Sequence, residues 1–181
     1  MWNPKNPSVA NVEKLKRKID KLRKGTIVRL GGMTDCFQPI ELDNRITYKI
    51  IKYLNKRRIG YLIVTKSSIV ANDEYLKIYD KDLAHFQITV TTTDDSKSVK
   101  YEKATVPSKR IEAIEKLYKN GFDVQVRLSP FIYEYIDFDI LNNIKCNKIL
   151  IEFLRVNHWI KQWFDIDYSK YTVKHAGYEP F

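Results

Sequence analysis

The sequence predicts an α/β fold in which about five parallel strands alternate with helices. Short runs rich in β-branched residues begin near residues 26, 60, 86, 122 and 148. Between them, apolar residues recur at helical spacing, and strands separated by helices in this way form βαβ units and a parallel sheet. Several strands are apolar on both faces, as a helix-covered sheet requires. A closed eight-stranded barrel takes about 250 residues, so an incomplete barrel and an open doubly wound sheet remain as alternatives.

The first expected element is a basic amphipathic helix within residues 1–25. Its apolar stripe consists of Val12, Leu15, Ile19 and Leu22. Ser8 or Asn11 can cap its start, and Gly25 can end it. Residues 1–25 hold eight Lys or Arg and two Asp or Glu, so they carry +6 of the chain's net charge of +10. This charge fits either a solvated outer face or a surface that contacts phosphates.

The other elements follow in alternation. Strands are expected at 26–30, 61–64, 86–90, 124–128 and 149–153. Helices are expected from Ile46 to a stop before Gly60, near 74–79, and from Pro107 to Gly121, because Pro favours a helix start and Gly a helix end. The expected organisation is therefore a partial barrel over 26–165, preceded by the helix of 1–25 and followed by an extension over 166–181.

Composition excludes several classes of protein. The two cysteines, Cys36 and Cys146, are 110 residues apart, too few for a disulfide framework or a cysteine-based zinc site, so we expect free thiols in a reducing cytoplasm. No apolar run approaches the length of about 20 residues needed to span a membrane. The sequence also has no glycine-rich phosphate loop after a strand, so it gives no support to a dinucleotide or nucleotide-triphosphate site.

Candidate binding residues stand where the expected strands end, because parallel α/β sheets bind ligands at the carboxyl ends of their strands. The glycines after the first strand would let the backbone approach a ligand closely. The candidates are Gly31, Gly32, Thr34 and Asp35 after the first strand, Lys66 after the second, Thr89 and Thr91 at the third, and Arg127 and Ser129 at the fourth. No histidine, cysteine or carboxylate pattern predicts a metal site.

Arg127 is the most informative of these residues. An arginine within an otherwise apolar strand needs a partner or a wet cavity, because an unpaired buried charge is very costly. Glu152, between Ile151 and Phe153 on the next strand, has the same requirement. The two side chains either pair with each other or face a polar ligand.

Four segments, taken in order, resemble the radical S-adenosylmethionine superfamily, in the branch that includes spore photoproduct lyase. They are Gly-Gly-Met-Thr-Asp-Cys-Phe-Gln-Pro-Ile-Glu (31–41), Ile-Val-Thr-Lys-Ser (63–67), Ile-Thr-Val-Thr-Thr-Thr-Asp (88–94) and Arg-Leu-Ser-Pro-Phe-Ile (127–132). The resemblance covers residues 25–155. It implies a partial barrel of the radical S-adenosylmethionine type, incomplete at its N-terminus, with five parallel strands and outer helices.

The resemblance also implies a cofactor and a chemistry. Family members hold a [4Fe–4S] cluster and S-adenosylmethionine, take electrons from a reductant such as flavodoxin or ferredoxin, and use the cofactor to abstract a substrate hydrogen. By position, Thr34 and Asp35 match the cofactor-contacting turn, and Lys66 matches a lysine near the cofactor's polar groups. Hydroxyl contacts of the family fall on Thr89 or Thr91 and on Ser129. Gly32 stands where photoproduct lyases have their hydrogen-donor cysteine, so repair of that photoproduct is not implied.

One family feature is missing from the sequence. The cluster ligands of the family lie in a C-x3-C-x2-C loop, which these 181 residues lack. The resemblance therefore predicts a fragment or degenerate copy that supplies the cofactor-binding strand ends, with a nucleic acid or a protein as its substrate.

Two other functions stay open. One is a non-catalytic nucleic-acid-binding module that uses the basic helix and the aromatic residues Tyr133, Tyr135, Trp159 and Trp163. The other is an α/β subunit that binds a partner protein.

Overall fold

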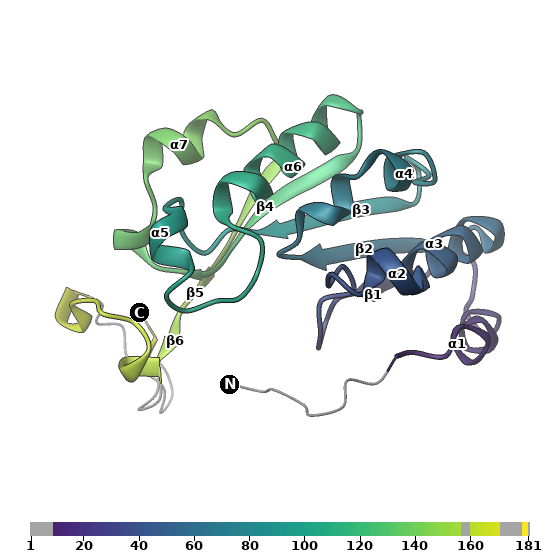
Figure 1. Ribbon diagram of the computed structural model, residues 1–181, viewed down its shortest axis with the longest axis horizontal. Coiled ribbons are helices and arrows are strands. Elements are labelled where there is room, and N and C mark those ends of the chain that lie inside the picture. Colours follow the sequence, from purple (N-terminus) through teal and green to yellow (C-terminus); the bar gives the residue numbers. More distant parts are fainter. Residues whose placement is uncertain (1–8, 157–159, 171–178, 181) are drawn as a thin grey trace.

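The computed structural model describes residues 9–156, 160–170 and 179–180. Within them, five parallel strands form one sheet in the order β1-β2-β3-β4-β5 (Figure 1). The strands are β1 (Ile27–Leu30), β2 (Gly60–Thr65), β3 (Ala84–Thr89), β4 (Asp123–Phe131) and β5 (Lys148–Phe153). The predicted fold class is confirmed. Ser8, Trp159 and, within the expected extension over 166–181, residues 171–178 and 181 lie outside the described residues.

Seven α-helices accompany these strands in the described residues. They are α1 (Val12–Ile19), α2 (Glu41–Asn44), α3 (Ile46–Arg57), α4 (Asp73–Leu76), α5 (Asp95–Ser98), α6 (Pro107–Lys119) and α7 (Phe138–Asn143). Single 3₁₀ turns are η1 (Ser68–Ala71), η2 (Tyr133–Tyr135), η3 (Ile160–Gln162) and η4 (Tyr168–Lys170), and a small antiparallel pair joins β6 (Arg155–Val156) to β7 (Glu179–Pro180). The sequence predicts α1, α3, α4 and α6, whereas α2, α5 and α7 have four to six residues and show no helical period.

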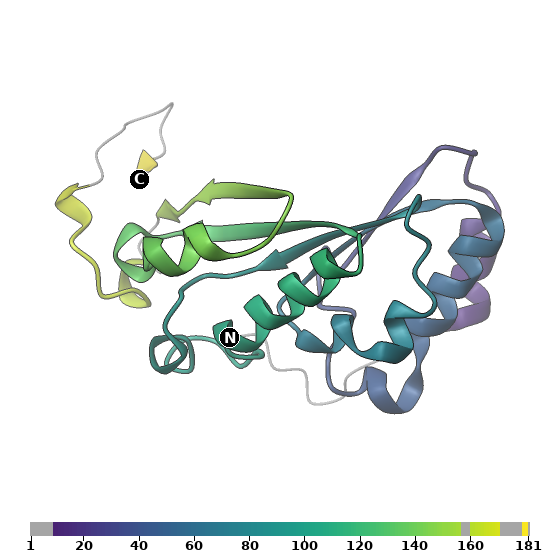
Figure 2. The ribbon, with the colours of Figure 1, turned by 90° about the horizontal axis from the view of Figure 1, so that it is seen from above.

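The helices gather on one face of the sheet. Each strand pairs with the strand that precedes it in the chain, and right-handed crossovers between such neighbours all pass over the same side. Figure 2 shows α3, α4 and α6 together below the strands. We call the opposite side the open face. On β3, buried Phe86 and Ile88 alternate with half-buried His85 and Gln87, so this strand is apolar on the helix-covered face and polar on the open face.

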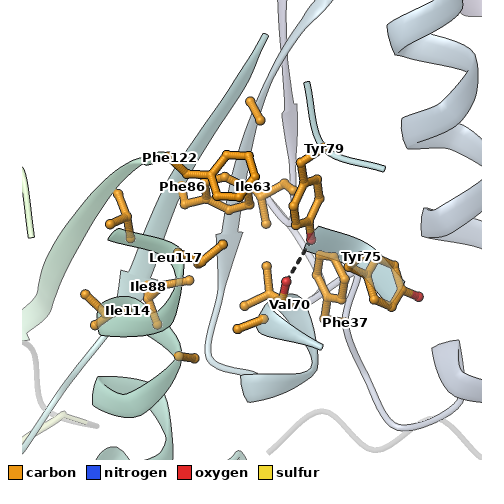
Figure 3. Packing of buried hydrophobic residues seen from close by; sticks show 14 of the residues in the cluster. Phe37, Ile63, Val70, Tyr75, Tyr79, Phe86, Ile88, Ile114, Leu117 and Phe122 are labelled. Atoms are coloured by element: carbon orange, nitrogen blue, oxygen red, sulfur yellow. Dashed lines mark hydrogen bonds between the residues drawn. The ribbon is translucent and has the colours of Figure 1, made fainter. Parts of the chain in front are cut away.

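The core between sheet and helices is rich in aromatic side chains (Figure 3). Phe86, Phe122 and Tyr79 contact one another edge to face, with ring centroids 4.8 to 5.7 Å apart. Tyr79 is buried, and its hydroxyl donates a hydrogen bond of 2.9 Å to the carbonyl of Val70. Buried tyrosines need such a partner, because an unsatisfied hydroxyl would cost about 1–3 kcal/mol. The ring cluster thereby fixes α4 against β3.

A buried carboxylate sets the start of α3. Glu41 accepts hydrogen bonds of 2.9 Å from the backbone amides of Thr47 and Tyr48, and one of 2.7 Å from the hydroxyl of Tyr75. The first amides of a helix have no partner within the helix, and a negative charge there is also favoured by the helix dipole. Glu41 therefore caps α3 and joins it to α4.

The helix α1 packs on α3 and is shorter than the segment 1–25. Asn11 caps it as predicted, since its side chain accepts a hydrogen bond of 2.9 Å from the amide of Lys14. At the other end, Asp20 accepts a hydrogen bond of 2.7 Å from the Tyr53 hydroxyl and lies 3.3 Å from the Arg57 guanidinium. These contacts join the last turn of α1 to the middle of α3.

Beyond the strand ends, a second apolar cluster closes the C-terminal part of the molecule. Ile132, Tyr135, Leu154 and Phe164 are its buried members. Tyr135 was expected among the exposed aromatic residues, and that expectation is wrong because Tyr101 and Phe164 pack against its ring. Within the residues that the structure covers, no helix is long and apolar enough to cross a membrane.

Gly31 allows the chain to leave β1 in close contact with β2. Its φ is +87°, and a Cβ atom built on it would lie 2.0 Å from the carbonyl oxygen of Val64. Gly25 has nearly the same φ, +86°, but nothing lies within 4 Å of the corresponding position. Substitution of the two glycines therefore distinguishes the cost of a positive φ, which both positions have, from the cost of steric overlap, which only Gly31 has.

We expect Gly31→Ala to destabilise the fold more than Gly25→Ala. Gly25→Ala should lower the free energy of unfolding only by the cost of a left-handed φ, about 1–2 kcal/mol. Gly31→Ala adds a steric overlap, which should lower it by at least about 2 kcal/mol more. Urea unfolding of the two variants and the unmodified chain measures both losses. Equal losses would show that the β1–β2 contact is not tight at Gly31.

Candidate functional site

Polar side chains form rows across the open face. The register of β3 and β4 places His85 beside Asp123, and Thr89 beside Arg127. The ring Nδ1 of His85 lies 2.7 Å from a carboxylate oxygen of Asp123, and the guanidinium of Arg127 donates to the Thr89 hydroxyl at 3.4 Å. Because paired residues of parallel strands share a face, this side of the sheet is polar along β3 and β4, whereas β2 contributes the apolar side chains of Leu62 and Val64.

Arg127 and Glu152 pair with each other, which decides between the two alternatives left by the sequence. The Nε of Arg127 donates to one carboxylate oxygen of Glu152 at 3.3 Å, and Nη2 donates to the other. Ser129 donates to the same carboxylate at 2.7 Å. The Ser129 hydrogen bond and the Arg127 guanidinium lower the pKa of Glu152, and Arg29 of β1 adds to this effect. Glu152 remains ionised and 46% exposed.

A cavity of about 690 Å³ adjoins this pair at the carboxyl ends of β4 and β5. This volume lies within the range of small-molecule sites, about 300–1,000 Å³. Its polar lining includes Ser129, Glu152 and Arg155, and its aromatic lining consists of Phe153, Trp163 and Phe164. An anion-binding group, a carboxylate and aromatic rings therefore surround one space at the ligand-binding end of the sheet.

The predicted residues of the loop after β1 fall into two groups, one that stabilises the loop and one that stays accessible to a ligand. Asp35 points into the structure, where its carboxylate accepts from the Thr65 hydroxyl at 2.7 and 2.8 Å and from the Lys66 amide at 2.7 Å. Asp35 thus ties the loop to the end of β2. Gly32 and Thr34 are exposed at the rim of the sheet, so their backbone and hydroxyl groups remain accessible to a ligand.

Lys66 belongs to a buried charged network that we call the Glu102 cluster, formed by Lys66, Thr91, Glu102 and Arg110. Glu102 accepts from the Lys66 amine at 2.5 Å and the Thr91 hydroxyl at 3.0 Å, and it also pairs with the Arg110 guanidinium. Arg110 is fully buried and donates further to the carbonyls of Thr89 and Thr105. The cluster joins the ends of β2 and β3 to α6.

The electrostatics of the Glu102 cluster keep its carboxylate charged. Burial acts to raise the pKa of Glu102, but the charges of Lys66 and Arg110 and the hydrogen bonds that both donate outweigh it and lower the pKa. Lys66 is 35% exposed on its side chain. An ammonium group has three donors, so Lys66 can bind a ligand while it holds Glu102.

The structure brings most of the predicted residues to one end of the sheet, in two groups. Arg127, Ser129 and Thr89 meet around Glu152, and Lys66 and Thr91 meet around Glu102. Gly31 contacts the backbone of β2, as described above, and both threonines are buried. Sequence reasoning missed Glu102, Arg110 and Arg29. Arg110 had a signal, since it occupies a buried position in the apolar stripe of α6, whereas Glu102 lies in a loop without periodicity.

The two cysteines do not make a metal centre. Among the described residues, no group of three or more His, Cys, Asp or Glu side chains could hold a metal ion. Burial, with Asp35 nearby, raises the pKa of Cys36, and burial also raises the pKa of Cys146. A raised pKa makes the thiolate, the form that binds metals, harder to form at both positions.

Comparison with solved structures finds a similar fold in spore photoproduct lyase. A cysteine-to-serine mutant of spore photoproduct lyase matches with a TM-score of 0.60 and 14% identity over 94% of this chain and 58% of that one. A second mutant, solved with bound AdoMet and dinucleoside spore photoproduct, matches with a TM-score of 0.57 and 15% identity over 93% and 57% of the two chains. The fold is thus that of a partial barrel resembling spore photoproduct lyase.

The curated relative is a protein of unassigned activity. The uncharacterized protein MJ0683 of Methanocaldococcus jannaschii is 30% identical over 161 residues, which cover 82% of this chain and 61% of that protein. No family model matches the sequence. The chain therefore spans about three fifths of the length of the proteins that it resembles.

We expect Glu102→Gln to cost about 3–5 kcal/mol of unfolding free energy at pH 7, because it leaves the buried Arg110 charge without its partner. The folded pKa of Glu102 is depressed, so its stabilisation is present above the unfolded value of about 4.3 and is lost as the pH falls through the folded pKa. Urea unfolding from pH 7 to pH 3 measures the difference, which should shrink with acid.

The matched control is Glu112→Gln. Glu112 is exposed and pairs with Lys109 within one helix, an arrangement worth less than about 1 kcal/mol. If both variants lost the same stability, the Glu102 cluster would not hold β2, β3 and α6 together.

Proposed function

We propose that the chain supplies the S-adenosylmethionine-binding strand ends of a radical S-adenosylmethionine enzyme. The observation that carries this proposal is the cavity beside Arg127, Ser129 and Glu152 at the carboxyl end of the parallel sheet. The fold likeness to spore photoproduct lyase, one of whose structures holds AdoMet, supports the same assignment. Other α/β proteins also bind ligands at this end of the sheet, so the proposal is tested by measuring the binding of S-adenosylmethionine directly.

The described residues fit the chemical groups of this cofactor. S-adenosylmethionine carries a carboxylate, an ammonium group, a ribose diol and an adenine ring. Lys66 and Arg127 would bind the carboxylate, since both retain donors beyond those used in their ion pairs. The exposed Glu152 carboxylate would accept from the ribose hydroxyls, and Trp163 offers a 60% exposed ring on which adenine would stack. Thr34 and the backbone of Gly32 would close the site from the loop after β1.

A [4Fe–4S] cluster does not fit the residues of this chain. Such clusters are bound by cysteine thiolates, usually four or three of them, and the sequence has two cysteines. The two are also separated in the fold, because Cys36 lies in the loop after β1 and Cys146 just before β5. Bound S-adenosylmethionine supplies an activated sulfonium group, while the protein's part in this proposal is to bind and orient the cofactor and to exclude water from it.

We expect S-adenosylmethionine to bind the isolated chain and to bind Thr34→Ala and Lys66→Ala about tenfold more weakly. Each variant removes one hydrogen bond or charged contact, which is worth about 1–2 kcal/mol. Isothermal titration calorimetry measures the three dissociation constants. Thr34 is exposed, so its replacement leaves the fold intact and separates binding from stability.

Lys103→Ala is the control for this series. Lys103 is exposed and follows Glu102 in the sequence but is not a member of the Glu102 cluster, so its loss should leave the affinity unchanged. The proposal fails if the unmodified chain shows no binding at millimolar cofactor, or if Thr34→Ala and Lys66→Ala both bind as tightly as the unmodified chain.

Reconstitution of the chain with iron and sulfide should not yield a stoichiometric cluster, because two cysteines cannot replace the usual set of three or four ligands. Iron and sulfide analysis with ultraviolet–visible and electron paramagnetic resonance spectra measures the product. A signal of one [4Fe–4S] cluster per chain would contradict this prediction.

A further inference from the structure

The net charge of the molecule is confined to one end. Residues 1–58 contain 15 Lys or Arg and five Asp or Glu, and residues 59–181 contain 17 of each kind. The whole net charge of +10 therefore lies before β2, and +9 of it lies in the described residues 9–58, which form the unit of α1, β1, α2 and α3. Figures 1 and 2 both show α1 and α3 side by side at the edge of the molecule.

The acidic residues of this unit are nearly all engaged. Glu13 pairs with Lys16, Asp20 binds Tyr53 and Arg57, and Glu41 caps α3. Asp35 binds the end of β2, as described above. Among the described residues of this unit, Asp43 is the exposed acid that forms no ion pair. The acids thus stabilise the fold and leave the surface cations without compensation.

Nine exposed cations of α1, the turn after it and α3 take part in no ion pair among the described residues. They are Lys14, Arg17, Lys18, Lys21, Arg23, Lys24, Lys49, Lys52 and Lys56, which we call the basic surface. Residues 14, 17 and 18 on α1 and residue 21 in the turn after it are three or four positions apart, and so are residues 49, 52 and 56 on α3.

We propose that the basic surface binds the phosphate backbone of a nucleic acid. A helix of twelve residues is about 18 Å long, and a duplex carries one phosphate charge for about every 1.7 Å of its axis. A duplex segment as long as α3 thus carries about ten phosphate charges, and α3 together with the neighbouring α1 and the turn after it presents nine cations. Lysine and arginine at this density provide affinity without base recognition.

The arrangement of α1 favours a nucleic acid over an anionic membrane. A helix that lies in a membrane surface buries its apolar side among the lipids. In this protein the apolar stripe of α1 packs against the core, where Ile19 is buried and Leu15 and Leu22 are partly buried. The side that remains exposed is cationic, so its attraction is purely electrostatic. Anionic vesicles serve as the competing outcome in the test.

The test uses the full chain and a fluorescein-labelled 24-base-pair duplex of mixed sequence. Fluorescence anisotropy from 50 to 200 mM KCl gives the slope of the logarithm of the association constant against the logarithm of salt. The variant Lys14→Gln/Arg17→Gln/Lys18→Gln/Lys21→Gln should weaken binding at least tenfold at 50 mM KCl and make the slope less steep by about one unit for each charge removed. A second variant, Lys49→Gln/Lys52→Gln/Lys56→Gln, should do the same from α3.

The control removes four charges elsewhere, in Lys77→Gln/Lys103→Gln/Lys119→Gln/Lys145→Gln, all of them exposed. It should bind within about twofold of the unmodified chain. Equal weakening in the control, or no effect of either basic-surface variant, would overturn the proposal. Binding to vesicles containing phosphatidylserine without binding to the duplex would overturn it as well. The result is independent of S-adenosylmethionine binding, because the two surfaces share no residue.

Discussion

The handedness of the crossovers is the constraint on which the rest of the molecule depends. Five parallel strands in sequential order place every connecting helix on the same side of the sheet. One face is then packed with aromatic and aliphatic side chains, and the connecting helices do not cover the other face. The open face can therefore carry ionic and hydroxyl groups that a doubly covered sheet would exclude, and the Arg127–Glu152 pair is the clearest instance.

Three carboxylates that are buried or partly buried hold loops and helix starts in place. Asp35, Glu41 and Glu102 each accept several hydrogen bonds from neighbouring elements, and none of them reaches freely into solvent. Loops at the carboxyl ends of parallel strands lack the regular hydrogen bonds of helices and sheets. A carboxylate offers about four acceptor sites, so one such side chain can satisfy the amides and hydroxyls of a whole turn. Rigidity at the site comes from these acceptors rather than from apolar packing.

The sequence allows prediction of the features that repeat locally. The alternation of strands and helices, the starts of α1 and α6, and the role of Gly121 all follow from periodicity and from the properties of glycine and proline, whereas the order of the strands in the sheet does not. Arg127 and Glu152 were predicted as either partners or ligand groups, and only the register of β4 and β5 could decide. Glu102 could not be found, because its partners Lys66 and Arg110 are 36 and eight residues away. Side-chain networks between distant loops leave no pattern in one sequence. The sequence therefore predicts that the site lies at the strand ends, but it does not predict which side chains contact one another there.

Sequential strand order also gives the molecule a modular construction. Each strand contacts only the strands before and after it in the chain, much as the units of a solenoid contact only their neighbours. Adding or removing a strand–helix unit at β1 or β5 would leave the connections of the remaining units unthreaded and unchanged. Evolution could therefore lengthen or shorten this sheet at its edges while the central strands keep the same inward and outward residues.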